Sequence, residues 1–316
     1  MTEANRPILN RAVTSKIADL SRRFAEAQPF RHVLIENFFA DDVLAELIRQ
    51  FPAPDPSKMV NEFGRGSKKF ARHDVRNIGS VYEELDDYIR SPQFATVMSE
   101  LTGIPHLLYD PEYHGAGTHD NHDGQGMDPH VDFNLHRTTG YHRRLNAIIY
   151  LNEEWDPQWG GNLELHKDPW DPAGDEVLSY PPFLNHCVLF ETNEYSWHGF
   201  HPVTLPPGKN ISRKSFTIYM YTKDRPLNEI ADKHGTIYVP RPLPDKLSGG
   251  IHAGRGGRRA PQAGLSEPRA DDPRFVRPRE EIPGHDRAAD AVRAQFHAAA
   301  PGLGRAGRTG DGADGQ

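Results

Sequence analysis

The chain has 316 residues, a formal net charge of -7 and 36% hydrophobic residues. This length suits one large domain or two small ones, and the apolar share is enough for one sizeable core. The acidic balance gives no reason to expect a nucleic acid as partner, because proteins that bind one normally present a basic surface.

Cysteine content and the N-terminus bear on the compartment. Cys187 is the single cysteine, so no disulfide can form within the chain, which favours a reducing environment. The N-terminal residues lack the basic and apolar regions of a secretory signal. No apolar run approaches the roughly 20 residues of a membrane-spanning helix. We therefore expect a cytoplasmic protein without a membrane partner.

Helices dominate the predicted elements of the first third of the chain. Apolar residues recur there at helical spacing, and a one-sided apolar stripe predicts a helix that lies against a sheet. A short strand is expected at 32–39, and the polar, glycine-containing residues 55–75 are expected to be a loop. The helices are expected at 14–28, from Asp41 or Asp42 to Phe51, and at 81–102, the last interrupted near Pro92.

From about residue 105 the pattern changes to short apolar or alternating runs separated by turn residues. This pattern is typical of an antiparallel sandwich or barrel. Helices followed by strands predict a mainly β fold, a jelly roll with one face buttressed by N-terminal helices. The runs are 106–113, 130–136, 144–152, 161–166, 186–192, 200–205 and 213–222.

Four regions of the chain follow from these patterns. Residues 1–104 are expected to form a helical buttress of the same domain, and residues 105–225 the β core that would hold a catalytic site. Residues 226–250 have apolar anchors and are expected to cover the barrel. Residues 251–316 contain eleven Arg and no Lys, with much Ala, Gly and Pro, so we expect a disordered tail.

His130 and Asp132 form the most specific local motif. Residues two apart on a strand point to the same face, so the imidazole and the carboxylate would project side by side. Two His and one carboxylate on one face of an octahedron are typical ligands of iron(II) in oxygenases. The second His must come from a distant strand, and His198 is the candidate, with His201 as the alternative. The isolated tripeptide is weak, because His-x-Asp also arises by chance.

Side-chain alternation selects a basic residue on the last strand. Phe216, Ile218 and Met220 share one face, which should pack on the helices. Arg213, Ser215, Thr217, Tyr219 and Tyr221 share the other face, which should line a cavity. A guanidinium at Arg213 can hold a carboxylate with two parallel hydrogen bonds. The alternative, without a role in the site, is an exposed Arg at the start of a strand.

Alternation also divides residues 144–152. Asn146, Ile148 and Tyr150 share a face, and the Tyr150 hydroxyl could reach the same carboxylate as Arg213. A half-buried core tyrosine is an equally good reading of Tyr150. The glycine-rich run that contains His114, His119 and His122 reads as a mobile polar lid rather than a second metal site.

Together these residues resemble the iron(II)/2-oxoglutarate-dependent oxygenases, in their prolyl-4-hydroxylase-like branch. The resemblance covers about residues 30–225, and no single motif is as specific as the combination. The glycines of Trp159-Gly160-Gly161 resemble the family's turn into the next strand. The carriers are the segments 130–134, 144–166, 196–203 and 213–222.

The resemblance implies a double-stranded β-helix (jelly roll) buttressed by N-terminal helices. It also implies iron ligands at His130, Asp132 and His198, with Arg213 on the distal carboxylate of 2-oxoglutarate and Tyr150 assisting. Asn146 and Thr217 would line the same cofactor cavity. The expected cofactors are Fe(II), 2-oxoglutarate as cosubstrate and O₂, with ascorbate as an optional addition. The expected reaction hydroxylates an unactivated C–H bond and releases succinate and CO₂.

Several alternatives stay open. The stretch between His198 and Arg213 is longer than in the family, so Lys209 or Lys214 could replace Arg213. A cupin-type metalloenzyme that does not use 2-oxoglutarate, or a non-catalytic jelly-roll binding protein, would share much of this pattern. The substrate could be a small molecule or a peptidyl residue, and the oligomeric state does not follow from the sequence. Because Asp132 is not replaced by Gly or Ala, a halogenase is disfavoured.

Overall fold

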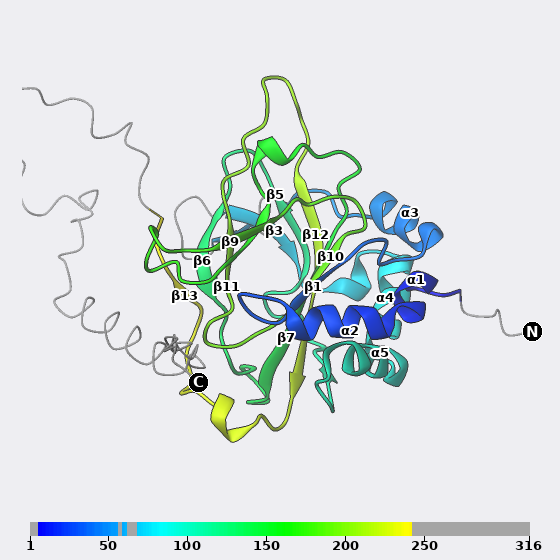
Figure 1. The fold of residues 1–316 in the computed structure, drawn as a ribbon. Coiled ribbons are helices and arrows are strands. Elements are labelled where there is room, and N and C mark those ends of the chain that lie inside the picture. Colours follow the sequence, from blue (N-terminus) through cyan, green and yellow to red (C-terminus); the bar gives the residue numbers. More distant parts are fainter. Residues whose placement is uncertain (1–5, 56–58, 62–67, 242–316) are drawn as a thin grey trace, which may run out of the picture. The chain divides into compact units, whose positions relative to one another are not determined.

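Two antiparallel sheets face each other in the computed structural model, which describes residues 6–55, 59–61 and 68–241 (Figure 1). The first sheet has eight strands, and β12 lies near its middle, paired with β7 and β5. Its strands, in spatial order, are β1 (His32–Ile35), β10 (Cys187–Glu191), β7 (His142–Tyr150), β12 (Arg213–Thr222), β5 (Gly117–Asn121), β3 (Lys68–Arg72) and β2 (Met59–Asn61), with β4 (Leu108–Tyr109) paired to β12.

The second sheet has five short strands and carries the two predicted histidine ligands. β6 and β11 are neighbours in it, and His130 lies directly opposite His198. Two segments that are far apart in the sequence are therefore joined by backbone pairing. The strands are β13 (Ile237–Tyr238), β6 (Met127–Val131), β11 (Trp197–Phe200), β8 (Leu163–His166) and β9 (Val177–Tyr180).

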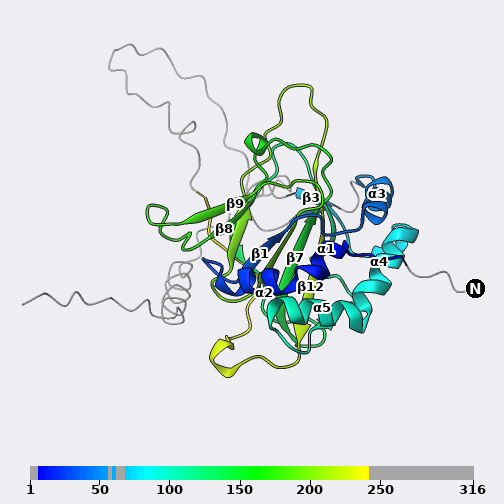
Figure 2. The ribbon, with the colours of Figure 1, turned by 45° about the vertical axis from the view of Figure 1, so that its right-hand side comes forward.

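Helices cover the outer face of the eight-stranded sheet, as Figures 1 and 2 show from two directions. Pro92 is the first residue of a helix, and the Ser91 hydroxyl before it accepts a hydrogen bond from the Phe94 amide, so the predicted interruption is a new helix start. The α-helices are α1 (Arg11–Ser15), α2 (Ile17–Glu26), α3 (Asp41–Arg49), α4 (Ser80–Arg90) and α5 (Pro92–Thr102); short 3-10 turns occur at Val75–Asn77, Pro157–Trp159 and Leu227–Glu229.

The main hydrophobic core lies between these helices and the sheet. It contains Phe216, Ile218 and Met220 of β12, so the predicted apolar face of this strand is confirmed. A smaller apolar cluster, which includes Tyr150, Leu163 and Phe190, packs β7 and β10 against β8. The helices therefore support the long strands from outside, and the cavity between the two sheets lies on the inner face of those strands.

Three predicted elements need correction. The segment 55–75 is not wholly a loop, because its described part contains β2 and β3, which extend the large sheet beyond β5. The glycine-rich run is not a lid, because it contains β5, which is paired on both sides and buried. The strand expected at 200–205 ends at Phe200 and begins at Trp197 instead. Strand β9 gave no signal that we recognised.

Gly117 shows why the glycine-rich run can enter the sheet. Its φ is +85°, and a Cβ there would lie 2.1 Å from the carbonyl oxygen of Arg72. Only glycine allows β5 and β3 to approach so closely at this point. The same glycine that suggested a mobile loop is thus a requirement of strand packing.

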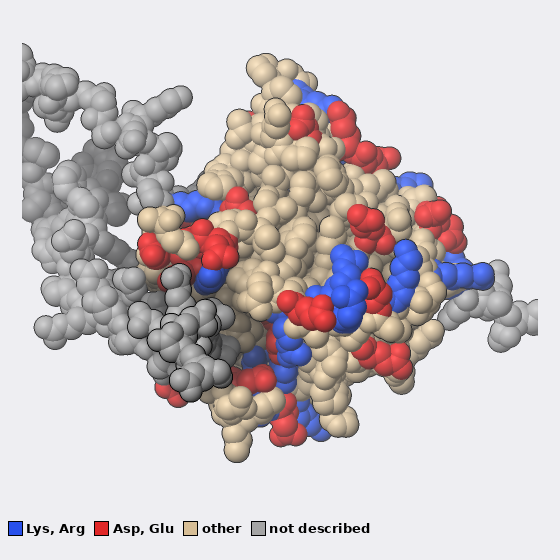
Figure 3. Space-filling view, in the orientation of Figure 1, with Lys and Arg blue, Asp and Glu red and all other residues tan. Residues whose placement is uncertain are grey.

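The surface and the chain ends give less information about the site than the two sheets do. On the face shown in Figure 3, acidic and basic side chains lie interspersed, and few of them occupy its centre. Within the described part of the chain, no helix has both the length and the apolar character needed to cross a membrane. The tail expected at 251–316, and the end of the extension at 242–250, lie outside the described residues.

Candidate metal centre

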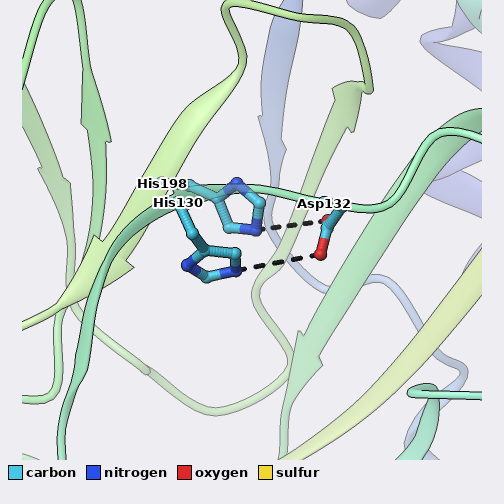
Figure 4. Close-up of side chains that lie close together, drawn as sticks. All are labelled: His130, Asp132 and His198. Atoms are coloured by element: carbon cyan, nitrogen blue, oxygen red, sulfur yellow. Dashed lines mark ion pairs between the residues drawn. The ribbon is translucent and has the colours of Figure 1, made fainter. Parts of the chain in front are cut away.

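His130, Asp132 and His198 meet inside the cavity between the sheets. One ligand atom of each lies within 4.8 Å of the others. The Nε2 of His130 is 3.8 Å from Oδ1 of Asp132, and the Nε2 of His198 is 3.4 Å from Oδ2 of the same carboxylate (Figure 4). The two imidazole centroids are 4.2 Å apart. His201, the alternative to His198, is largely exposed and faces Glu164 instead.

Backbone carbonyls orient both histidines. The Nδ1 of His130 lies 2.9 Å from the Asp128 carbonyl, and the Nδ1 of His198 lies 2.9 Å from the Ser196 carbonyl. Since a carbonyl only accepts, each Nδ1 carries the proton and donates it. Each Nε2 is left with a lone pair directed toward Asp132, which is the tautomer that a metal ligand needs.

The electrostatics agree with this arrangement. Burial lowers the pKa of His198 to about 3, and burial also lowers the pKa of His130. Burial by itself would raise the pKa of Asp132, but the charge of Arg143 and the two histidines hold it at about 2. At neutral pH the three side chains are therefore two neutral imidazoles and one carboxylate.

This donor set fits a divalent transition metal ion. Three buried atoms with lone pairs point at one another, and a cation between them would relieve their repulsion and satisfy all three. Two imidazoles and one carboxylate suit iron(II) with further positions left open. The residues present therefore fit the metal that the sequence predicts, with His130, Asp132 and His198 as its ligands.

Arg213 lies on the wall of the same cavity. It is buried, its Nε donates to the Gly161 carbonyl at 2.6 Å, and its Nη2 donates to the Tyr150 hydroxyl at 3.0 Å. Gly161 has a φ of +67°, and a Cβ there would lie 3.1 Å from the Cδ of Arg213, so this glycine serves the arginine as well as the turn. The guanidinium is thus oriented by two acceptors before any ligand arrives.

The two alternatives to Arg213 lie elsewhere. Lys214 points to the opposite side of β12, where its ammonium lies over the Phe51 ring. Lys209 pairs with Glu154 and lies over the Trp159 ring. Tyr150 is fully buried and reaches the site only through Arg213. A cupin-type enzyme would have been favoured if Arg213 pointed away from the metal residues. In the structure, Arg213 lines the same cavity as they do.

The other two predicted residues, Asn146 and Thr217, also line the cavity. The Asn146 amide nitrogen lies 3.5 Å from Asp132 Oδ2, so it is beside the carboxylate of the candidate centre. Ser215, which was expected on the cavity face of β12, joins them, and so does His119, which we had not assigned to the site. Within the described part of the chain, four buried atoms of this wall have no hydrogen-bond partner: Asn146 Oδ1, His119 Nε2, Ser215 Oγ and Thr217 Oγ1. Such a group of atoms indicates a wall built for a polar ligand.

Further cavity residues come from parts of the chain that sequence reasoning did not connect with the site. Lys69 on β3 lines the cavity, and so do Thr236 and Tyr238 around β13. Tyr238 lies opposite His130 in the strand pairing, with ring centroids 5.1 Å apart. Arg143, behind Asp132, was also missed. Arg143 is the second residue of β7, and in the sequence it is only a basic residue near the start of a strand.

The comparisons with known proteins agree with this centre. Residues 116–221 match a family model described as the 2OG-Fe(II) oxygenase superfamily, and this segment contains all seven of the predicted site residues. No curated protein sequence matches the chain.

Several solved structures match the chain at low sequence identity. A prolyl hydroxylase from Trichoplax adhaerens, in complex with a peptide fragment, is 17% identical with a TM-score of 0.45, over 68% of this chain and 94% of that chain. A Pseudomonas putida prolyl-4-hydroxylase is 18% identical with a TM-score of 0.44, over 66% and 99%. HygX from Streptomyces hygroscopicus, with nickel and 2-oxoglutarate bound, is 13% identical with a TM-score of 0.41, over 74% and 97%.

Proposed function

We propose that this protein is a dioxygenase of the 2OG-Fe(II) oxygenase superfamily, whose family model matches residues 116–221, and that it hydroxylates an unactivated C–H bond of its substrate. Fe(II) is held by His130, Asp132 and His198, and the distal carboxylate of 2-oxoglutarate is held by Arg213. The observation that carries the proposal is that these four side chains line one cavity, although they come from three segments of the chain.

When Fe(II), 2-oxoglutarate and O₂ are bound together they supply the oxidation, and succinate and CO₂ are the co-products. The chain itself binds and orients. Three side chains on one side of the metal leave the other positions open. Arg213, oriented by Gly161 and Tyr150, presents a planar cation to an incoming carboxylate. The buried walls exclude water from the reacting groups.

The substrate of this proposal is a small molecule or a peptidyl residue. The site chemistry places no further demand on it than a C–H bond that can reach the cavity. Ascorbate belongs to the proposal only as an additive that sustains turnover, and turnover measured with and without it decides that part.

The test is an anaerobic titration of the full-length protein with Fe(II) and 2-oxoglutarate, followed by visible absorption. We expect a charge-transfer band that needs both components, and we expect it to be absent from Asp132→Ala and retained by His201→Ala. If the wild-type protein binds Fe(II) but never develops the band with 2-oxoglutarate, the metalloenzyme without 2-oxoglutarate is the better account. If it binds neither, the proposal fails.

A further inference from the structure

Arg143 is a fully buried arginine beside the candidate metal centre. It belongs to β7, and its Nη2 lies 2.8 Å from Oδ2 of Asp132, with none of its side chain exposed. Two other side chains lie near this oxygen: the Nε2 of His198 is 3.4 Å away and the amide nitrogen of Asn146 is 3.5 Å away. The carboxylate of Asp132 is therefore shared between a guanidinium on one side and the two imidazoles on the other.

Two aromatic rings hold the guanidinium in place. Its central carbon lies 3.4 Å from the centroid of Tyr219 and 4.6 Å from that of Phe133. The Tyr219 hydroxyl in turn donates to the Gly115 carbonyl at 2.7 Å, so this ring is fixed as well. A planar cation between two rings has little freedom to move away from the carboxylate.

A buried arginine at this position lowers the stability of the protein unless its charge is compensated. Burial of a charge carries a large desolvation penalty, which a single ion pair repays only with good geometry and further hydrogen bonds. Within the described part of the chain, none of the three guanidinium nitrogens of Arg143 makes a hydrogen bond, so Nη2 meets Asp132 Oδ2 as an ion pair. Stability alone therefore accounts poorly for an arginine here, and its one close anion is the carboxylate that we assign to the metal.

We propose that Arg143 is a positioning residue that holds Oδ2 of Asp132 and so directs the carboxylate to bind the metal through its other oxygen. The inference rests on the proposed function, because it needs Asp132 as a metal ligand. A carboxylate held in this way keeps one orientation, binds through one oxygen and leaves neighbouring positions of the metal for the cosubstrate. Partners of metal ligands commonly contribute about 10–100-fold to metal affinity.

Arg143 has two opposing effects on metal binding, so the direction of the change in metal affinity shows which effect is larger. Its positive charge repels a bound cation, whereas its grip prevents the carboxylate from rotating. If the grip dominates, the neutral variant Arg143→Gln binds metal more weakly. If repulsion dominates, Arg143→Gln binds metal more tightly. Arg143→Lys separates the two, because an ammonium keeps the charge but lacks the planar fork.

Arg144 provides a matched control one residue away. It is also buried in an ion pair, but its Nη2 lies 3.0 Å from Oε1 of Glu191, and Glu229 lies further away. Its partners are not metal ligands. Arg144→Gln and Arg144→Lys should lower the melting temperature of the protein and leave its metal affinity unchanged.

The experiment is a titration of each full-length variant with Co(II), whose visible absorption reports the coordination of the ion, beside thermal unfolding of the metal-free protein. For Arg143→Gln we expect a dissociation constant raised about 10-fold or more and an altered absorption spectrum. For Arg143→Lys we expect a smaller rise, and its conserved charge and bulk keep the test possible if Arg143→Gln does not fold.

The possible results distinguish a failure of the proposed function from a failure of the role proposed for Arg143. If wild-type protein does not bind Co(II), or if Asp132→Ala binds it as well as wild type does, the proposed function fails. If wild type binds and a folded Arg143 variant has the same spectrum and affinity, or a tighter affinity, the positioning role of Arg143 is overturned. A loss of affinity in the Arg144 variants equal to that in the Arg143 variants would overturn it too.

Discussion

The two ends of the cavity are built differently. The two histidines come from β6 and β11, short strands of the smaller sheet, and their rings are oriented by local backbone carbonyls. Arg213 comes from β12, a ten-residue strand of the larger sheet, whose opposite face is packed against the helices. The metal end thus depends on local hydrogen bonds, and the cosubstrate end depends on the hydrophobic core behind it.

This difference predicts how each end responds to substitution. A metal ligand can be removed with little loss of packing, because the ligands project into a cavity. Removal of one of the three clustered ligand atoms can even stabilise the metal-free protein, because it relieves their mutual repulsion. Changes near Arg213 disturb a strand that carries core residues, so binding and stability should change together there.

The largest effect is expected for the metal ligands. His130→Ala, Asp132→Ala and His198→Ala should each abolish turnover of 2-oxoglutarate, because each removes a ligand of the metal. Their folds should survive, which circular dichroism and thermal unfolding can check. The matched control is His201→Ala, which should keep activity. An inactive His201→Ala beside an active His198→Ala would show that the ligand assignment is wrong.

The next effect is expected at Arg213. Two charge-assisted hydrogen bonds to a carboxylate are each worth about 1.5–3 kcal/mol, so Arg213→Ala should raise the apparent constant for 2-oxoglutarate about 100-fold or more. Arg213→Lys should be nearly as harmful, because an ammonium lacks the planar fork. Iron affinity, measured separately by titration, should change little.

Lys214→Ala is the control for Arg213, since this side chain lies on the opposite side of β12. We expect only a small change in the constant for 2-oxoglutarate. A larger effect from Lys214→Ala than from Arg213→Ala would mean that the cosubstrate lies on the other face of the strand. The assignments of Thr217 and Tyr219 to the cavity would then have to be withdrawn as well.

The smallest effect is expected for Tyr150→Phe. This change removes the hydroxyl that accepts from Arg213 at 3.0 Å and leaves the ring in its apolar cluster. A single hydrogen bond contributes about 1 kcal/mol, so the constant for 2-oxoglutarate should rise about 5-fold, with the iron constant unchanged. An unchanged 2-oxoglutarate constant would assign Tyr150 to the core alone, as the sequence also allowed.

The local chemistry of the site could be predicted from the sequence by itself. Strand periodicity placed Arg213 and Thr217 on one face of β12 and Phe216 on the other, because alternation is a property of the extended backbone and needs no partner. The same reasoning put His130 beside Asp132. The helices of the first third were predicted for the same reason, since their apolar stripes repeat within a single segment.

Partners across the fold were decided only by the tertiary structure. Nothing near His198 specifies that it pairs with His130, and nothing near Arg143 specifies that it meets Asp132, because strand register is set by packing and by closure of long loops. β5 contains turn-forming residues, and β3 is short and mostly basic. Both become strands only because neighbouring strands satisfy their backbone groups. Such a strand forms because of residues elsewhere in the chain, so its own local sequence pattern cannot predict it.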